Sequence, residues 1–80
     1  MAHDDPNPNT LLRRRIAAEA LTAVGYPVRP ATLASMATRG GGPPFRRFGR
    51  VPLYRWGDLL DWAEGRLSLP MRSTSEADAA

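Results

Sequence analysis

The stretch Thr38–Asp61, TRGGGPPFRRFGRVPLYRWGDLLD, decides the fold that this chain of 80 residues can adopt. Two short segments rich in apolar residues, Phe45–Phe48 and Leu53–Trp56, are joined by residues 49–52, GRVP. Glycine can adopt a positive φ and proline fixes its φ, so the sequence predicts two strands joined by a turn over residues 49–52. So small a hairpin is not stable alone in water. We therefore expect it to pack against helices and to direct its arginines outward.

Apolar residues at helical spacing predict a first helix over Arg13–Val24. Its expected buried face comprises Ile16, Ala17, Ala20, Leu21 and Val24. Gly25 ends the helix, because glycine readily adopts the left-handed conformation that closes many helices. Before this helix, Thr10–Leu12 is expected to form a short extended segment that places Leu12 against the core.

A second helix is expected over about Pro30–Arg39, since proline suits the first helical position. Its expected buried side is formed by Leu33, Met36 and Ala37. Its expected outward residues are Thr32, Ser35, Thr38 and Arg39. A short helix with a small, polar outer face can enter the DNA major groove without a clash. The same face is also compatible with an ordinary solvated surface.

Residues 40–44, GGGPP, end this helix and lead into the hairpin. They lack the Gly-Lys-Ser/Thr ending of a phosphate-binding loop, so nucleotide binding is not expected. In the hairpin, the expected core side is formed by Phe45, Phe48, Leu53 and Tyr54. The expected solvent-facing arginines are Arg46, Arg47, Arg50 and Arg55.

A third helix over Gly57–Leu67 closes the expected domain, with Asp58 in the first turn, where a negative charge agrees with the helix dipole. Its expected apolar face comprises Leu59, Leu60, Trp62, Ala63 and Leu67. Trp56 and Trp62 are expected in the core rather than as base-stacking platforms. We expect one domain over residues 10–68, preceded by a disordered tail over residues 1–9 and followed by a flexible tail over residues 69–80.

The positive charge of the chain is concentrated in one section. There are eleven arginines and no lysine. Nine arginines lie between Arg13 and Arg55 with a single acid, Glu19, which gives this section a net charge of +8. Such segregation indicates a polyanionic partner, and the planar guanidinium suits phosphate and guanine. An arginine-for-lysine bias of the genome would explain the missing lysines but not the segregation.

The triplet Arg13–Arg15 is unusual, because three cations in the first turn of a helix oppose its dipole. Either the helix begins later or a bound anion offsets the repulsion. A solvated face and a contact with phosphate therefore remain as alternatives for this triplet.

The residue types needed for most catalytic and metal sites are missing. The chain has no cysteine, and its one histidine, His3, lies in a polar stretch. Asp58 and Asp61 lie three apart on one expected helix and are better explained as surface charges. We expect no catalysis, no metal and no cofactor. Neither a signal peptide nor an apolar run of about 20 residues is present, so we expect a cytoplasmic, nucleoid-associated protein with no membrane partner.

The expected elements follow the order of a winged helix-turn-helix: helix, turn, second helix, glycine-proline break, basic hairpin and closing helix. The stretches RGGGPPF (39–45), FGR (48–50), YR (54–55) and DLLDW (58–62) resemble the small MerR-like excisionases and AlpA-type DNA-binding proteins. The segments IAAEAL (16–21) and ATL (31–33) are similar to the first helix and the recognition helix of that family. The similarity covers about Leu12–Leu67 and is strongest to recombination directionality factors, the excisionases of integrative mobile elements.

The resemblance implies a mainly α-helical fold with a small β-hairpin, in which the second helix reads the major groove and the wing contacts backbone or minor groove. The matching groove residues are Thr32, Ser35, Thr38 and Arg39. The matching wing residues are Arg46, Arg47 and Arg50. We also expect backbone contacts from Arg13, Arg14 and Arg55.

Such factors are implied to bind several adjacent sites on double-stranded DNA, to bend it and to help a separate integrase excise the element. The expected partners are therefore double-stranded DNA, an integrase and further copies of the chain along the DNA. An AlpA-like transcriptional regulator is the alternative. An RNA-binding or protein-interaction adaptor is a third functional class. A comparison of binding to duplex DNA with binding to structured RNA would distinguish it from the first two.

Three features depart from the family pattern. Arg13 and Arg29 stand where the family usually has a serine or threonine helix cap. The loop Thr22–Val28 is longer than the usual tight turn. Pro52 removes a hydrogen-bond donor from the wing.

Overall fold

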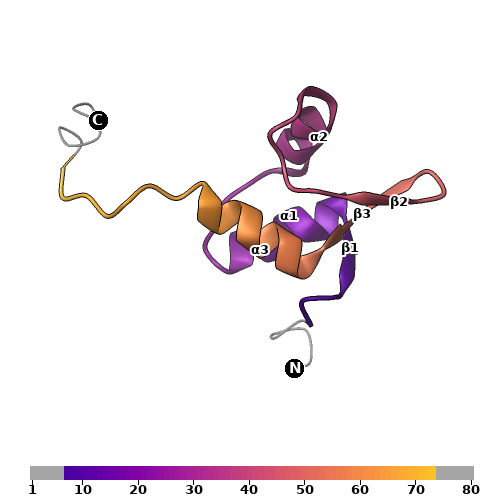
Figure 1. The fold of residues 1–80 in the computed structure, drawn as a ribbon, viewed down its shortest axis with the longest axis horizontal. Coiled ribbons are helices and arrows are strands. Elements are labelled where there is room, and N and C mark those ends of the chain that lie inside the picture. Colours follow the sequence, from indigo (N-terminus) through magenta and orange to yellow (C-terminus); the bar gives the residue numbers. More distant parts are fainter. Residues whose placement is uncertain (1–6, 74–80) are drawn as a thin grey trace.

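A three-stranded antiparallel sheet stands at one end of the molecule, and three helices complete the fold within residues 7–73, the part of the chain that the computed structural model describes (Figure 1). The elements run in the order β1 (Leu11–Arg13), α1 (Arg14–Ala23), α2 (Pro30–Arg39), β2 (Arg46–Phe48), β3 (Val51–Arg55) and α3 (Trp56–Gly65). Of the expected tails over residues 1–9 and 69–80, residues 1–6 and 74–80 lie outside the described residues. None of the helices within residues 7–73 has the length and apolar content of a membrane span.

Strand β3 lies in the middle of the sheet, with the order β1-β3-β2. Leu12 is paired with Tyr54 and packs against the core, as the sequence predicts. The sequence did not predict that this short N-terminal segment joins the hairpin as a third strand. Strand β3 is therefore paired on both sides, and the hairpin becomes part of a three-stranded sheet. A two-stranded hairpin of this size would not be stable alone in water.

The core lies between the helices and the inner face of the sheet. Its fully buried residues are Ala17, Ala18, Leu21, Leu33, Tyr54, Trp56, Leu59 and Ala63. Helix α1 packs against α2, α3 and the sheet, so its buried face is wide and built from small residues. The predicted face of α1 is therefore wrong at its ends: Ile16 and Val24 are 40% and 53% exposed. The predicted burial of Leu67 in the third helix is also wrong, since α3 ends at Gly65 and Leu67 is 61% exposed.

The turn of the β2–β3 hairpin is shorter than the predicted residues 49–52. Phe48 pairs with Val51, so only Gly49 and Arg50 form the loop. Gly49 has a φ of 66°, and a glycine at the first position of a two-residue loop is typical of a type II′ turn. Phe48 follows the strand outward and is 77% exposed, so its predicted place in the core is wrong.

Pro52 fits within β3 because of the register. The residues that flank a two-residue loop form a hydrogen-bonded pair, and such pairs alternate along an antiparallel ladder. The next pair, Arg47 and Pro52, is therefore one in which β3 donates no hydrogen bond to β2. On its other side β3 meets β1 only from Leu53 onward, where Arg13 is its partner. The missing N–H of Pro52 consequently leaves no acceptor without a donor.

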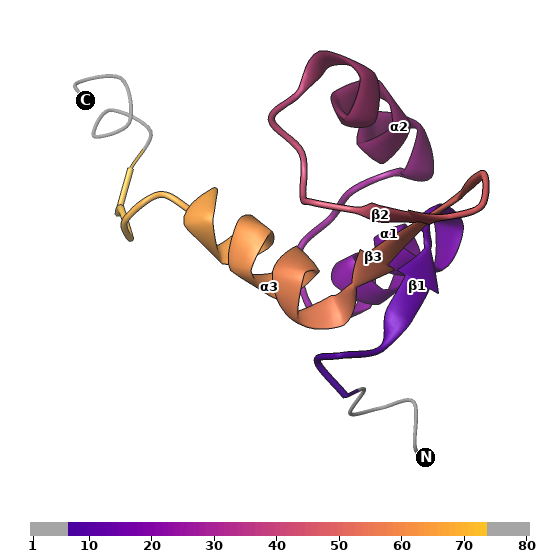
Figure 2. The same ribbon diagram turned by 45° about the vertical axis from the view of Figure 1, so that its right-hand side comes forward.

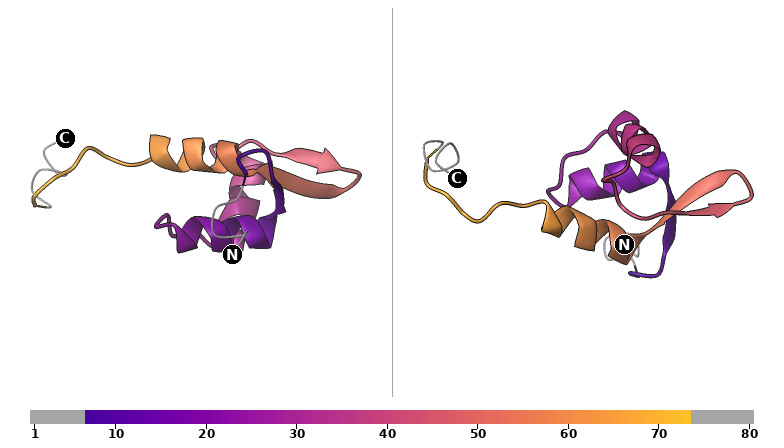
Figure 3. Two further views of the ribbon diagram at one scale, coloured as in Figure 1. Left: turned by 90° about the horizontal axis from the view of Figure 1, so that it is seen from below. Right: turned by 45° about the horizontal axis from the view of Figure 1, so that its top comes forward.

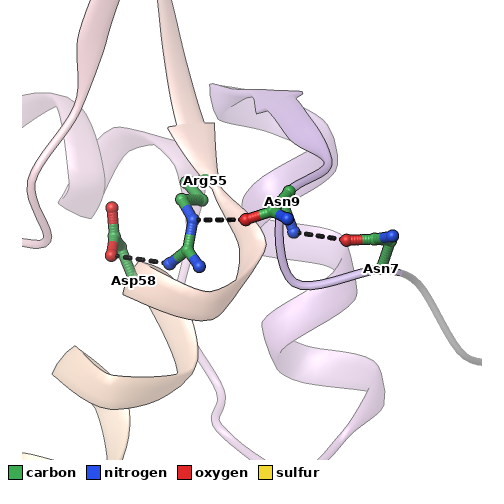
Figure 4. A network of polar contacts seen from close by, with 4 residues as sticks. All are labelled: Asn7, Asn9, Arg55 and Asp58. Carbon is green, nitrogen blue, oxygen red and sulfur yellow. Dashed lines mark hydrogen bonds and ion pairs between the residues drawn. The ribbon is translucent and has the colours of Figure 1, made fainter.

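The carbonyls of Pro8 and Thr10 cap the start of α3, so residues 7–9, which the sequence placed in a disordered tail, take part in the fold. The Trp56 N–H donates to the Thr10 carbonyl at 2.9 Å, and the Gly57 N–H donates to the Pro8 carbonyl at 2.8 Å. These bonds satisfy amides that a helix start leaves without an intrahelical partner. Figure 4 shows the side chains beside them: Arg55 donates to the Asn9 side-chain oxygen at 3.0 Å and pairs with Asp58 at 3.0 Å.

Two contacts hold α2 in place. The Thr22 hydroxyl donates to the Val28 carbonyl at 3.2 Å and accepts from the Val28 N–H at 3.3 Å, which closes the loop between α1 and α2. After α2, Gly40 and Gly41 have φ of 96° and 91°, which other residues rarely adopt. The Trp62 indole N–H donates to the Gly41 carbonyl at 2.9 Å and ties this connector to α3.

Truncation of a core leucine on α3 tests this packing. Leu59 is 0% exposed, so Leu59→Ala should lower the free energy of unfolding by about 2–5 kcal/mol. Leu67→Ala, at a largely exposed position, should change it by less than about 0.5 kcal/mol. Urea denaturation followed by tryptophan fluorescence measures both. Equal losses for the two variants would contradict the placement of the core.

Candidate nucleic-acid interface

An open groove of about 500 Å³ separates α2 from the β2–β3 hairpin. Figure 2 shows the two elements facing each other, with α2 above the strands. The groove is lined by Arg14, Ala34, Ala37, Thr38, Phe45, Arg47, Arg50 and Pro52. Helix α2 contributes small side chains and the hairpin contributes long cations. An extended anion such as a phosphate backbone could lie in this groove and contact both α2 and the hairpin.

The register of the hairpin directs Arg47 into this groove. Directly opposed residues of an antiparallel pair share a face, and residues two apart on one strand do as well. Arg47 is opposite Pro52 and so lies on the same face as the buried Tyr54, which is the face toward the helices. Arg46 is opposite Leu53 and lies on the outer face. Both are exposed, but only Arg47 lines the groove.

Arg14 forms part of the groove floor and is fixed by Tyr54. Its Nε donates to the Tyr54 hydroxyl at 3.0 Å, and the guanidinium carbon lies 5.8 Å from the centre of the tyrosine ring. Tyr54 is 1% exposed and its ring packs against Phe45 at a centroid distance of 5.6 Å. Because the tyrosine is immobilised by the core, Arg14 begins with a defined direction and loses less side-chain freedom when it binds an anion.

A second hollow of about 420 Å³ adjoins the groove and is lined by Arg13, Arg14, Arg15, Ile16, Arg50, Val51 and Pro52. The two hollows share Arg14, Arg50 and Pro52. Together they bring five cations to one region of the surface, which we call the arginine cluster: Arg13, Arg14, Arg15, Arg47 and Arg50. The cluster joins the start of α1 to the tip of a hairpin more than 30 positions later in the sequence.

The arginine triplet is accommodated without a side-chain cap. Arg13 is the N-cap residue of α1 and makes no capping bond. Arg15 pairs with Glu19 at 3.1 Å on an exposed face, where such a pair contributes little. The helix begins at Arg14, so the alternative in which it starts after the triplet is wrong. Repulsion between the helix dipole and these cations is relieved only in part by the Tyr54 hydroxyl and Glu19.

Within residues 7–73, Glu19 is the one acidic group that pairs with a member of the arginine cluster. Within residues 7–73 the ion pairs are Arg15–Glu19 and Arg55–Asp58. Asp61 and Glu64 are exposed on α3, and neither pairs with an arginine in that part of the chain. Arg55 is held between Asn9 and Asp58, so its charge is partly balanced internally and it lies apart from the groove. A contact between Arg55 and DNA stays a prediction.

The structure divides the predicted residues of α2 between two sides of that helix. Thr38 lines the groove with Ala34 and Ala37. Ser35 and Arg39 are exposed but line neither hollow of the arginine cluster. Thr32 lines a separate hollow of about 220 Å³ on the other side of α2, beside Met36 and Trp62. Thr32 and the hairpin arginines therefore do not share one concave surface.

Sequence reasoning gave no functional role to Ala34 and Ala37, which are apolar. Ala34 lies one turn before Thr38 and three residues before Ala37, a spacing that places these side chains on one side of the helix. Arg15 was considered only as part of the triplet, for which a contact with phosphate was one of two alternatives. The cluster is open and cationic, and residues 7–73 contain no group of three or more histidine, cysteine or acidic side chains that could hold a metal ion.

Comparison with known proteins adds no relative to this description. No protein-family model matches the chain. No curated protein matches it significantly.

Replacement of Tyr54 by phenylalanine tests whether its hydroxyl orients Arg14. Tyr54→Phe keeps the buried ring and removes the acceptor for Arg14 Nε. We expect binding to a fluorescein-labelled DNA duplex to weaken about three- to tenfold, less than for loss of a hydrogen bond to a charged group, because the lost bond orients Arg14 and does not itself contact DNA. The far-UV circular dichroism spectrum should be unchanged.

The matched control is Tyr26→Phe, at a half-buried tyrosine outside the groove. It should bind the duplex with wild-type affinity in the same fluorescence anisotropy titration. A wild-type affinity for Tyr54→Phe would show that the orientation of Arg14 has no part in anion binding.

Proposed function

We propose that this chain is a winged helix-turn-helix protein that binds double-stranded DNA, with α2 as the recognition helix and the β2–β3 hairpin as the wing. The observation that carries the proposal is the groove in which Thr38 and the alanines of α2 face Arg14, Arg47 and Arg50. A phosphate backbone lying in this groove would let helix and hairpin contact the same duplex.

The dimensions and chemistry of α2 fit a major groove. Its ten residues span about 15 Å, and the groove of B-DNA is about 12 Å wide and admits one helix. The exposed and groove-lining side chains of α2 between Ala31 and Thr38 are small. Backbone approach is therefore not obstructed. The deep, narrow major groove of double-stranded RNA would not admit the helix, which favours DNA.

The arginine cluster supports contacts with phosphate. Its members are exposed, except for the half-buried Arg14, and apart from Arg15 they make no ion pair within residues 7–73. Unneutralised arginines at a helix start repel one another and the dipole, and a phosphate backbone relieves both repulsions. Phosphate contacts fix the orientation of the protein on the duplex, and the contacts of α2 with base edges provide the sequence preference.

We further propose that the protein is a recombination directionality factor, which binds repeated sites beside an attachment site and promotes excision of a mobile element by an integrase. The support is the resemblance of residues 39–62 to excisionases. The small size of the domain adds to it, because one copy covers too little duplex for tight, specific binding alone. In this role the protein acts in the cytoplasm on the nucleoid and cuts no strand itself.

Footprinting on the attachment region of the element that encodes the chain tests this role. We expect protected direct repeats beside the recombination site, and more excision product when the protein is added to integrase. Protection of a promoter alone, with no change in excision, would reject excision and favour transcriptional control. No protection of any duplex, with binding to structured RNA instead, would reject the DNA-binding proposal itself.

Salt dependence tests the contacts of the wing with phosphate. If about 5–7 phosphates are neutralised, log K should fall against log salt with a slope of about −5 to −6, and Arg50→Ala should reduce the magnitude of that slope by about 1. Arg66→Ala is the matched control, because Arg66 stacks on Trp62 at 5.1 Å, outside the arginine cluster. Anisotropy titrations from 50 to 200 mM salt give the slopes. An unchanged slope for Arg50→Ala would exclude its contact with phosphate.

Threonine substitutions on the two sides of α2 test base readout. Thr38→Val removes a hydroxyl from the groove and keeps the side-chain shape, so it should change the preference among DNA sites by about 1–3 kcal/mol at one position. Thr32→Val, on the other side of the helix, should leave the preference unchanged. Selection from a randomised duplex library gives both profiles. Identical profiles for wild type and Thr38→Val would reject readout through the groove.

A further inference from the structure

The wing carries one large apolar side chain that the fold does not use. Phe48 is 77% exposed, more than any other large apolar residue on a helix or strand within residues 7–73. It is the last residue of β2 before the turn, and its cross-strand neighbour is Val51. Figure 3 shows the hairpin projecting beyond the body of the molecule in both views. A phenylalanine there gains nothing from the core.

The neighbours of Phe48 are cations. Arg47 precedes it in β2, and Arg50 is the second residue of the two-residue turn that follows it. Arg47 and Phe48 point to opposite faces of the hairpin, because side chains alternate along a strand. Arg47 therefore faces the groove, and Phe48 reaches a duplex only where the tip of the hairpin enters the minor groove. Arg50, in the turn beside Phe48, would hold a phosphate next to the base step that Phe48 reaches.

The outer face of the sheet does not fit a protein partner as well. Its apolar residues alternate with arginines in the register: Leu11 is opposite Arg55, and Leu53 lies between Arg13 and Arg46. Leu53 and Val51 are already half-buried. The core of a protein interface is contiguous, apolar and depleted of charge. The exposed apolar surface here is concentrated at the tip, in one aromatic ring.

We propose that Phe48 is an apolar wedge, which inserts from the minor groove between two base pairs and kinks the duplex, with Arg50 of the turn bound to a neighbouring phosphate. This inference rests on the proposed DNA binding and assigns the residue that bends the DNA. Apolar side chains inserted in this way unstack one step and bend the duplex toward the major groove. Flexible pyrimidine–purine steps should be preferred at the kink, since they unstack most readily.

A mismatch scan on one duplex tests the wedge. The probe is a 30-base-pair duplex with a single site selected from a random library, and a single mismatch is moved through it one position at a time. A mismatch at the kinked step removes part of the unstacking cost, so wild-type protein should bind that duplex about tenfold more tightly than the matched one. Phe48→Ala should show no preferred position, and Phe48→Leu, which keeps an apolar wedge, should retain most of the preference.

Energy transfer between dyes at the two ends of the matched duplex gives the bend. The bend should fall by at least half with Phe48→Ala and should be unchanged with Leu11→Ala, an exposed apolar residue of the same sheet away from the tip. The salt slope should stay at its wild-type value in both variants, because no cation is removed.

The outcomes separate the two proposals. Absence of any duplex binding by wild type would reject DNA binding. Binding with a flat mismatch profile, or with the same profile and bend in Phe48→Ala, would overturn the wedge and leave DNA binding intact. An unchanged bend on a single site with loss of cooperative binding to several sites would assign Phe48 to a contact between proteins instead, and would also overturn the wedge.

Discussion

The hydrogen bond from Arg14 to Tyr54 connects the core of this protein to its charged surface. Tyr54 lies in the middle strand, is 1% exposed and carries its hydroxyl to the first residue of α1. A buried hydroxyl without a partner would cost about 1–3 kcal/mol, so the core itself requires an arginine or another donor at that position. The same bond fixes where a cation stands on the groove floor. The packing of Tyr54 in the core and the position of the Arg14 charge are therefore linked through this one hydrogen bond.

A second constraint is the start of α3, which fixes the position of the N-terminal segment before β1. This helix follows β3 without a loop, and its N-cap residue Arg55 provides no side-chain cap. The carbonyls of Pro8 and Thr10 take the place of a cap, while Asp58 gives the first turn a negative charge that suits the helix dipole. The segment before β1 is therefore structural, and it keeps β1 paired with β3. Since β1 leads directly into α1, this arrangement also sets the position of the arginine triplet.

Local patterns predicted the helices well: α2 has the expected bounds, and the other two end within two residues of them. Contacts between segments that are far apart in the sequence were harder to predict. Residues 7–9 form no regular element, and the role of Pro8 depends on a backbone carbonyl that any residue has. The exposure of Phe48 follows from a turn of two residues rather than four, and a short stretch of sequence does not fix that register. For the site, the arginines were evident from charge, but only the crossing of α1 and α2 decides that Thr38 and not Thr32 faces them.

The separation of charge along the sequence becomes a separation in space, and this has an energetic consequence. The arginine cluster lies at the hairpin end, while Asp61 and Glu64 stand on α3, which leads away from the hairpin (Figure 1). Asp61 and Glu64 make no ion pair with a cluster arginine within residues 7–73, and physiological salt screens surface charges over about 8 Å, so they neutralise the cluster little. The fold therefore tolerates mutual repulsion among five arginines at the junction of α1 and the hairpin. Burial of Tyr54 and the rigid sheet hold them together, and a phosphate backbone in the groove would convert that repulsion into binding free energy.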